Sequence, residues 1–138
     1  MKKYLMFFVL IILSSCNNDD NNYNDARLLR GRWLWVSSTG GFSGGTITAS
    51  KDKNELELEF SATHLTTYTD GIVTTKRKYF IVNKESIFGG YKNMIITEKE
   101  NAIDQEFSIN ESYTVNGDEL ILASECYDCY TSKYKKVK

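Results

Sequence analysis

The sequence predicts an all-β protein, an antiparallel up-and-down barrel of about eight strands. Residues 55–60 alternate strictly between acidic and apolar side chains, which is the period of a half-buried strand. Two pairs of β-rich runs flank the short turns Asp70-Gly71 and Asn116-Gly117-Asp118, and such turns favour hairpins. The other β-rich runs are also short and separated by turn residues, a spacing typical of an antiparallel barrel or sandwich.

The chain opens with the pattern of a secretory signal. Two lysines precede an apolar run at residues 4–13, and two serines and Cys16 follow it. The run has roughly half the length that a bilayer-spanning helix needs, so a transmembrane anchor is the weaker interpretation. Ending on Cys16, the segment resembles the lipobox of bacterial lipoproteins. The resemblance implies a signal peptide at residues 1–15 and lipid on Cys16.

A polar tether is expected at residues 16–25. Eight of the nine residues after Cys16 are Asn or Asp, so burial of apolar side chains cannot order them. The pair Asp19-Asp20 resembles the export signals of surface lipoproteins in Bacteroidetes-type bacteria, while a plain spacer is the open alternative. We therefore expect an outer-membrane lipoprotein of the cell envelope, held to the membrane by the lipid on Cys16, with exposure at the cell surface if the Asp pair acts as an export signal.

The charge of the expected mature chain is small. Removal of residues 1–15 takes two lysines from 17 basic residues, which leaves 15 against 18 acidic residues and a net charge of −3. The charges are mixed along the chain, so we expect no nucleic-acid partner. The remainder is long enough for one domain with a single core, which we place at residues 26–138.

Within this domain the expected elements follow one another in a simple order. Residues 24–29 can form one helical turn, with Asn24 or Asp25 as its cap. A strand then begins at Gly31, and a mobile glycine-rich loop is expected at residues 37–45. The further expected strands, from their β-branched, aromatic or alternating residues, are 55–60, 66–69, 72–75, 78–82, 93–97, 107–115, 119–123 and 130–137.

A family resemblance begins at Gly31-Arg32-Trp33. A Gly-x-Trp motif after a helical turn resembles the opening of a lipocalin barrel, and residues 28–138 resemble small lipocalin-like lipoproteins of Bacteroidetes. The residues that carry this second likeness are Leu29, Gly31, Trp33, Trp35, Gly40, Gly41, Leu120, Leu122, a Cys/Asp loop and a Tyr-rich last strand. The resemblance implies that Trp33 plugs the closed end of the barrel. It also implies a basic residue packed on Trp33, at Lys135 or Lys136, where the family usually has arginine.

Aromatic residues are the candidate ligand-binding residues. Trp33 and Trp35 alternate on one strand, so both indoles are expected to point into the interior. Phe42 lies in the middle of the glycine-rich loop and is the expected tip of a lid over the open mouth, although a simple surface loop is the alternative. Tyr68 and Tyr79 belong to the aromatic residues expected to fill or line the interior. A barrel of this size is either filled by side chains or holds one small ligand, and the sequence leaves both open.

The remaining reactive residues favour structural roles. Cys126 and Cys129 are expected to form a disulfide, because an exported chain meets an oxidising environment. No helix pattern follows them to support redox chemistry, and two thiolates alone make a weak metal signal, so no metal site is expected. His64 is the only histidine, and nothing around Thr63, His64 and Leu65 resembles a nucleophile elbow. We therefore expect no enzyme and no cofactor.

The sequence thus favours a lipid-anchored barrel that binds a small apolar or amphipathic molecule. The alternative is a surface structural or protein-interaction module with a filled core and no small ligand. Fold alone does not decide between them.

Overall fold

The computed structural model describes residues 26–50, 54–98 and 110–138. The predicted signal peptide, Cys16, the tether and the first residues of the predicted strand at 107–115 lie outside these ranges. One helical turn at residues 26–29 precedes nine strands. Their bounds are β1 Gly31–Gly40, β2 Gly45–Thr48, β3 Leu56–Phe60, β4 His64–Thr69, β5 Ile72–Glu85, β6 Tyr91–Thr97, β7 Glu111–Asn116, β8 Glu119–Ser124 and β9 Tyr130–Lys136. Among the described residues, no helix has the length and apolarity needed to cross a membrane.

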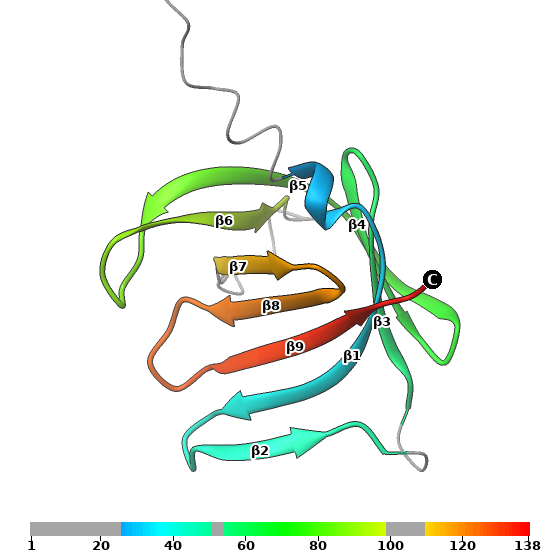
Figure 1. The fold of residues 1–138 in the computed structure, drawn as a ribbon, viewed down its shortest axis with the longest axis horizontal. Helices are drawn as coiled ribbons and strands as arrows, with labels where there is room; N and C mark the ends of the chain where they lie inside the picture. Colours follow the sequence, from blue (N-terminus) through cyan, green and yellow to red (C-terminus); the bar gives the residue numbers. More distant parts are fainter. Residues whose placement is uncertain (1–25, 51–53, 99–109) are drawn as a thin grey trace, which may run out of the picture.

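The strands form a closed antiparallel barrel, as predicted. Each of the strands from β3 to β8 pairs with the next one along the chain, and β1 pairs with both β3 and β9 (Figure 1). Eight strands therefore complete the wall, and β2 is a ninth strand that pairs with β1 alone. Closure joins the backbone groups of the first and last wall strands, which an open sheet would leave exposed at its edges.

The glycine-rich segment differs from its prediction as a loop over the mouth. Its first residues continue β1 to Gly40, and its last residue begins β2, so only residues 41–44 form a turn. The hydroxyls of Thr39 and Thr46 are hydrogen-bonded across this hairpin at 3.1 Å. Gly40 has a φ of 127° and Gly44 a φ of 64°, values that glycine adopts readily. The glycines thus form a tight hairpin, so the loop is much shorter than the predicted residues 37–45.

β1 changes partners halfway along its length. Its first part pairs with β3 from Gly31 to Leu34, and its last part pairs with β2 from Ser37 to Gly40. The opposite edge of β1 pairs with β9, and a bulge interrupts that pairing between Trp35 and Ser37. The wall therefore divides at Trp35, where β3 ends its contact with β1 and β2 begins.

The core fills one end of the barrel around Trp33. This side chain is fully buried, and its Nε1 donates a hydrogen bond to the carbonyl of Leu29 at 2.6 Å, which holds the helical turn over the barrel end. The ammonium of Lys136 lies 4.9 Å from the centre of the indole ring, so lysine makes the cation–π contact expected at Lys135 or Lys136. The other core side chains are Leu29, Leu58, Phe60, Tyr79, Ile95, Leu120, Leu122 and Tyr134.

All members of this core lie between Leu29 and Tyr134. A chain that begins at residue 17 therefore contains all of the core found among the described residues, and we expect it to fold without the residues before it.

Tyr68 lies outside the barrel, which corrects its expected place in the interior. The β3–β4 register sets Tyr68 opposite Glu57, on the face opposite to Leu58 and Phe60. There its hydroxyl donates a hydrogen bond to Glu59, and the guanidinium of Arg32 lies 4.4 Å from the centre of its ring. The sequence analysis missed this because it assigned Tyr68 by residue type, whereas the register with the acidic face of β3 decides its side.

Candidate ligand-binding cleft around Trp35

Two adjoining hollows lie where the wall divides, and we call them together the Trp35 cleft. The larger has a volume of about 420 Å³, and the smaller one of about 320 Å³. The larger is lined by Trp35, Ser38, Asn54, Leu56, Thr69, Ser132 and Tyr134. The smaller is lined by Leu34, Trp35, Ala49, Ser50, Asn54, Glu55 and Leu56. Both volumes fall in the range of small-molecule sites, and Trp35 belongs to both linings.

The lining of the larger hollow comes from the inner face of neighbouring strands. Trp35 of β1 is paired with Tyr134 of β9, and Ser38 is paired with Ser132. On the other side of the division, Leu56 of β3 is paired with Thr69 of β4. These register pairs bring side chains from four strands to one opening, although their positions span much of the chain.

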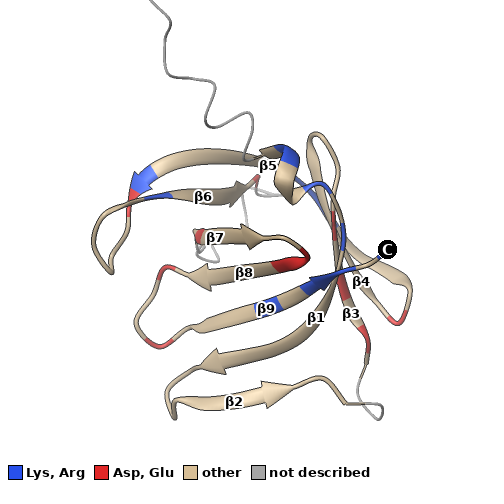
Figure 2. Ribbon diagram, viewed as in Figure 1, with Lys and Arg blue, Asp and Glu red and all other residues tan. Residues whose placement is uncertain are grey.

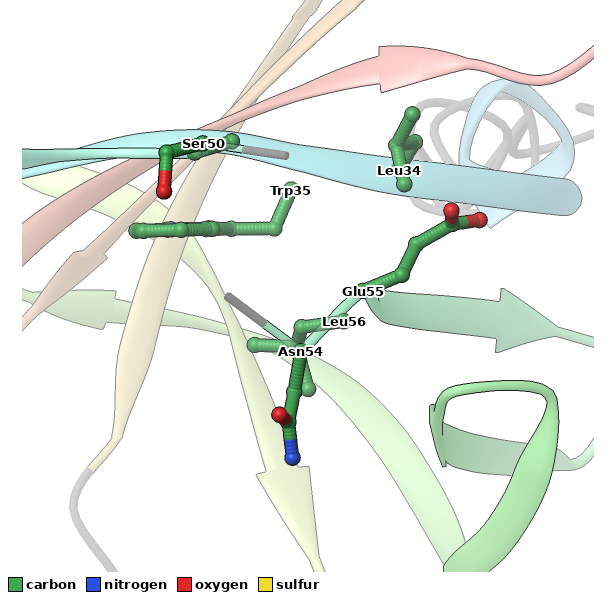
Figure 3. Close-up of a pocket in the computed structure, with 7 residues that line it drawn as sticks. Leu34, Trp35, Ser50, Asn54, Glu55 and Leu56 are labelled. Atoms are coloured by element: carbon green, nitrogen blue, oxygen red, sulfur yellow. The ribbon is translucent and has the colours of Figure 1, made fainter. Parts of the chain in front are cut away.

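The indole of Trp35 is held in place by hydrogen bonds. Its Nε1 donates to the hydroxyl oxygen of Ser38 at 2.9 Å, and that oxygen lies 2.7 Å from the hydroxyl oxygen of Ser132. Figure 3 shows the ring nearly edge-on, with Ser50 on one side and Leu56 and Asn54 on the other. The indole N–H thus has a hydrogen-bond partner within the protein. The apolar faces of the ring remain for contact with a ligand.

The structure places the other predicted ligand-binding residues away from this cleft. Trp33 and Tyr79 are buried in the core, and the hydroxyl of Tyr79 donates to the carbonyl of Ser61 at 2.8 Å. Phe42 is 96 % exposed at the β1–β2 turn, and Tyr68 lies on the outer face. Of the five predicted residues, Trp35 alone lines either hollow.

Several polar lining residues were missed by the sequence analysis. Ser38 is inward because the bulge after Trp35 shifts the alternation of β1 by one residue, so strict alternation from Trp33 gives the wrong face. Ser132 and Thr69 are inward through their pairing with Ser38 and Leu56. Alternation along β9 could have indicated that Ser132 and Tyr134 share a face.

Near Tyr134 lies a partly buried carboxyl group, that of Glu111 in β7. Burial raises the pKa of Glu111, and a hydrogen bond with Ser124 opposes this shift. Burial also raises the pKa of Tyr134, and the nearby carboxylate of Glu111 raises it further. Both shifts favour the uncharged forms of these two groups.

Glu111→Gln is expected to flatten the dependence of stability on pH. Because the folded-state pKa of Glu111 is raised, its contribution is fully present below the unfolded value near 4.5 and is lost as pH rises through the folded value. Urea unfolding from about pH 4 to pH 8 measures this effect. Glu119→Gln, an exposed change in the same hairpin, serves as the control. An unchanged pH slope for Glu111→Gln would contradict the assignment.

Exposed aromatic side chains gather where the turns at residues 41–44, 86–90 and 125–129 meet, and we call this group the aromatic tip. Its members are Phe42, Phe88, Tyr91, Tyr127 and Tyr130, which are between 43 % and 96 % exposed. Phe88 and Tyr127 make an edge contact, with ring centres 6.0 Å apart. The three turns are the loops seen at the left of the barrel in Figure 1.

Specific contacts fasten these turns together. The carboxylate of Glu125 accepts hydrogen bonds from the hydroxyl of Ser86 and the backbone N–H of Ile87, at 2.8 and 3.0 Å. Cys126 and Cys129 form the predicted disulfide, with Cα atoms 5.4 Å apart. The backbone N–H of Gly41 donates to the carbonyl of Cys129 at 3.1 Å. The aromatic side chains are therefore presented on a fixed framework.

No group of three His, Cys, Asp or Glu side chains that could hold a metal occurs among the described residues. The Nδ1 atom of His64 lies 2.8 Å from the hydroxyl of Thr63, at the start of β4.

Comparisons of the chain with protein-family models, with curated proteins and with solved structures found no match.

Proposed function

We propose that this protein is a lipid-anchored, lipocalin-like barrel of the cell envelope that binds a small apolar or amphipathic molecule in the Trp35 cleft. One observation carries the binding proposal: a fixed indole lies between two hollows whose linings combine apolar surface with a few hydroxyl and amide groups. Ligand sites are typically apolar hollows with a small number of placed polar groups. The closed barrel supplies the rigid wall that holds them.

The anchoring proposal rests on the sequence around Cys16. Labelled palmitate is expected to enter the full-length protein expressed in a Gram-negative host, and Cys16→Ala is expected to remain unlabelled. Acylation at this sulfur adds the apolar chain that tethers the domain to the membrane. Fractionation of outer-membrane vesicles from the same cells measures where the protein resides. Equal labelling of both chains would exclude Cys16 as the acceptor.

Trp35→Ala is expected to reduce retention of a small molecule at least tenfold. We would incubate wild-type and variant chains of residues 17–138 with a lipid extract of the cell envelope, purify them again and compare their masses by native mass spectrometry. Loss of the indole removes the central apolar surface of both hollows, so the variant should carry at least tenfold less bound ligand, which corresponds to about 1.4 kcal/mol of binding free energy.

Phe42→Ala is the matched control, because Phe42 is an exposed aromatic on the adjoining hairpin and lines neither hollow. It should retain the ligand as the wild type does. A bound mass that survives Trp35→Ala unchanged would remove the cleft as the binding site.

A second candidate function, a protein-interaction module without a small ligand, is favoured by the aromatic tip. Exposed aromatic clusters on a fixed framework are common at protein interfaces. The same mass measurement separates the candidates: a wild-type protein with no retained small molecule favours the second one.

A further inference from the structure

The aromatic tip holds its side chains in contact with water. Phe42 and Tyr127 are its two most exposed members, at 96 % and 81 %. The hydrogen bond from Gly41 to Cys129 joins their two turns. The ring of Tyr130 lies against the same glycine, where an added Cβ would be 2.8 Å from the ring carbon Cζ. Because the turns are fixed, burial of this apolar surface requires a partner outside the domain, and such burial is favourable.

The residue types in the tip are those found where a protein meets a membrane–water interface. Phenylalanine offers an apolar ring, and tyrosine, which is enriched at such interfaces, adds a hydroxyl that stays among polar groups. The ammonium of Lys92 lies 5.8 Å from the centre of the Phe88 ring. A lysine in this position covers apolar surface with its alkyl stem while its charge remains in water. The tip therefore combines apolar rings with polar ends that suit lipid head groups.

Charged residues of both signs lie beside the aromatic rings. Figure 2 shows basic and acidic residues on the β5–β6 hairpin and acidic residues on the turn between β8 and β9. In the sequence these residues are Lys84, Glu85, Lys92, Glu125 and Asp128. Since the two signs offset each other among these residues, the aromatic rings are the groups that can hold the tip to a bilayer. A zwitterionic lipid is therefore the appropriate probe.

A bilayer fits the size of the tip better than a folded protein partner does. The tip presents five side chains on three turns, whereas a typical protein interface uses about 20–30 residues on each side. Binding to a bilayer needs less, because a few apolar side chains at the boundary between head groups and acyl chains contribute in proportion to the area they bury.

The proposed lipid anchor brings a bilayer within reach of the tip. β1 runs from Gly31, beside the closed end, to Gly40, beside the tip, and its ten residues span about 33 Å. The segment from residue 16 to residue 25 joins the proposed lipid to the described domain and can extend over at most about 36 Å. This length is sufficient for the tip to touch the same bilayer that holds the lipid on Cys16.

We propose that the aromatic tip docks onto the surface of a phospholipid bilayer, with its rings at the level of the head groups. The inference goes beyond the proposed ligand-binding cleft, and it takes from the proposed anchor only the nearness of a membrane. Ser38 in the cleft lining and Gly40 beside the tip are two residues apart on β1. Docking therefore brings the Trp35 cleft close to a bilayer, which is a source of amphipathic molecules.

Flotation of the unlipidated chain with vesicles tests the docking. Residues 17–138 would be mixed with phosphatidylcholine vesicles at several lipid concentrations and floated through a sucrose gradient, and the bound fraction would be measured. The double variant Phe42→Ser, Tyr127→Ser removes the two most exposed rings of the tip, and the fold should be retained because both side chains lie outside the core. We expect this variant to bind at least tenfold more weakly than the wild type.

The double variant Ile72→Ser, Val73→Ser is the matched control, because it removes two exposed apolar side chains from the β4–β5 hairpin. It should bind vesicles within twofold of the wild type. A tip variant that floats as well as the wild type would overturn the proposal. A wild type that does not float would also overturn it and would leave the tip to a protein partner. Neither result bears on ligand binding in the cleft, which the mass measurement with Trp35→Ala tests separately.

Discussion

Trp33→Ala should destabilise this protein more than any other single substitution considered for its core. Truncation of a fully buried tryptophan removes a large apolar surface and leaves a cavity, at a cost of about 3–5 kcal/mol. It also removes the donor to the Leu29 carbonyl, which releases the helical turn from the barrel end. A domain of this size has a total stability of about 5–15 kcal/mol, so much of it would be lost.

Urea unfolding, followed by circular dichroism, measures the loss caused by Trp33→Ala. Lys136→Met is the matched control, because it removes the cation above the indole and keeps an aliphatic chain there. We expect the control to cost about 1 kcal/mol or less. A loss below about 1 kcal/mol for Trp33→Ala would show that this indole does not organise the closed end.

Gly40→Ala should cost about 3 kcal/mol or more, although it adds one methyl group near the surface. The φ of 127° at Gly40 is strained for any residue with a Cβ, at about 1–3 kcal/mol. An added Cβ would also lie 2.4 Å from the backbone carbonyl oxygen of Cys129. That oxygen belongs to the disulfide-closed loop and accepts from Gly41, so relief requires movement of the β1–β9 contact.

Gly44→Ala separates backbone strain from the steric clash. Gly44 also has a positive φ, but nothing lies within 4 Å of a Cβ added there. We expect a cost of about 1–2 kcal/mol for this control. Thermal unfolding of both variants under identical conditions provides the comparison. Equal destabilisation would mean that the close approach to Cys129 is without consequence.

Much of the fold follows from local sequence patterns. The alternation of leucines and glutamates in β3 sets its two faces. Turns form at Asp70-Gly71, as predicted, and at Gly117-Asp118, within the predicted turn Asn116-Gly117-Asp118. Trp33 was placed at the closed end through its motif, and Lys136 packs on it. The strand faces and the turns depend on residues close together in the sequence, and the Trp33–Lys136 contact depends on one motif. These features can therefore be predicted from the sequence.

The cleft depends on relationships that alternation does not encode. The bulge after Trp35 turns Ser38 inward, and the change of partner along β1 opens the wall at that place. Tyr68 was assigned to the wrong face because only its register with β3 decides where it lies. Of the residues that line the cleft, the sequence analysis identified Trp35. Its polar neighbours could not be identified, because they come from other strands and the pairing of those strands was not known from the sequence.

The pairing of β1 with β9 also sets an order of events in time. Ser38 and Ser132, which are hydrogen-bonded across it, are 94 residues apart, so the barrel cannot close before residues 130–136 have been synthesised. Contacts over such long sequence separations form slowly. The nascent chain therefore has no closed barrel until its last strand has been synthesised.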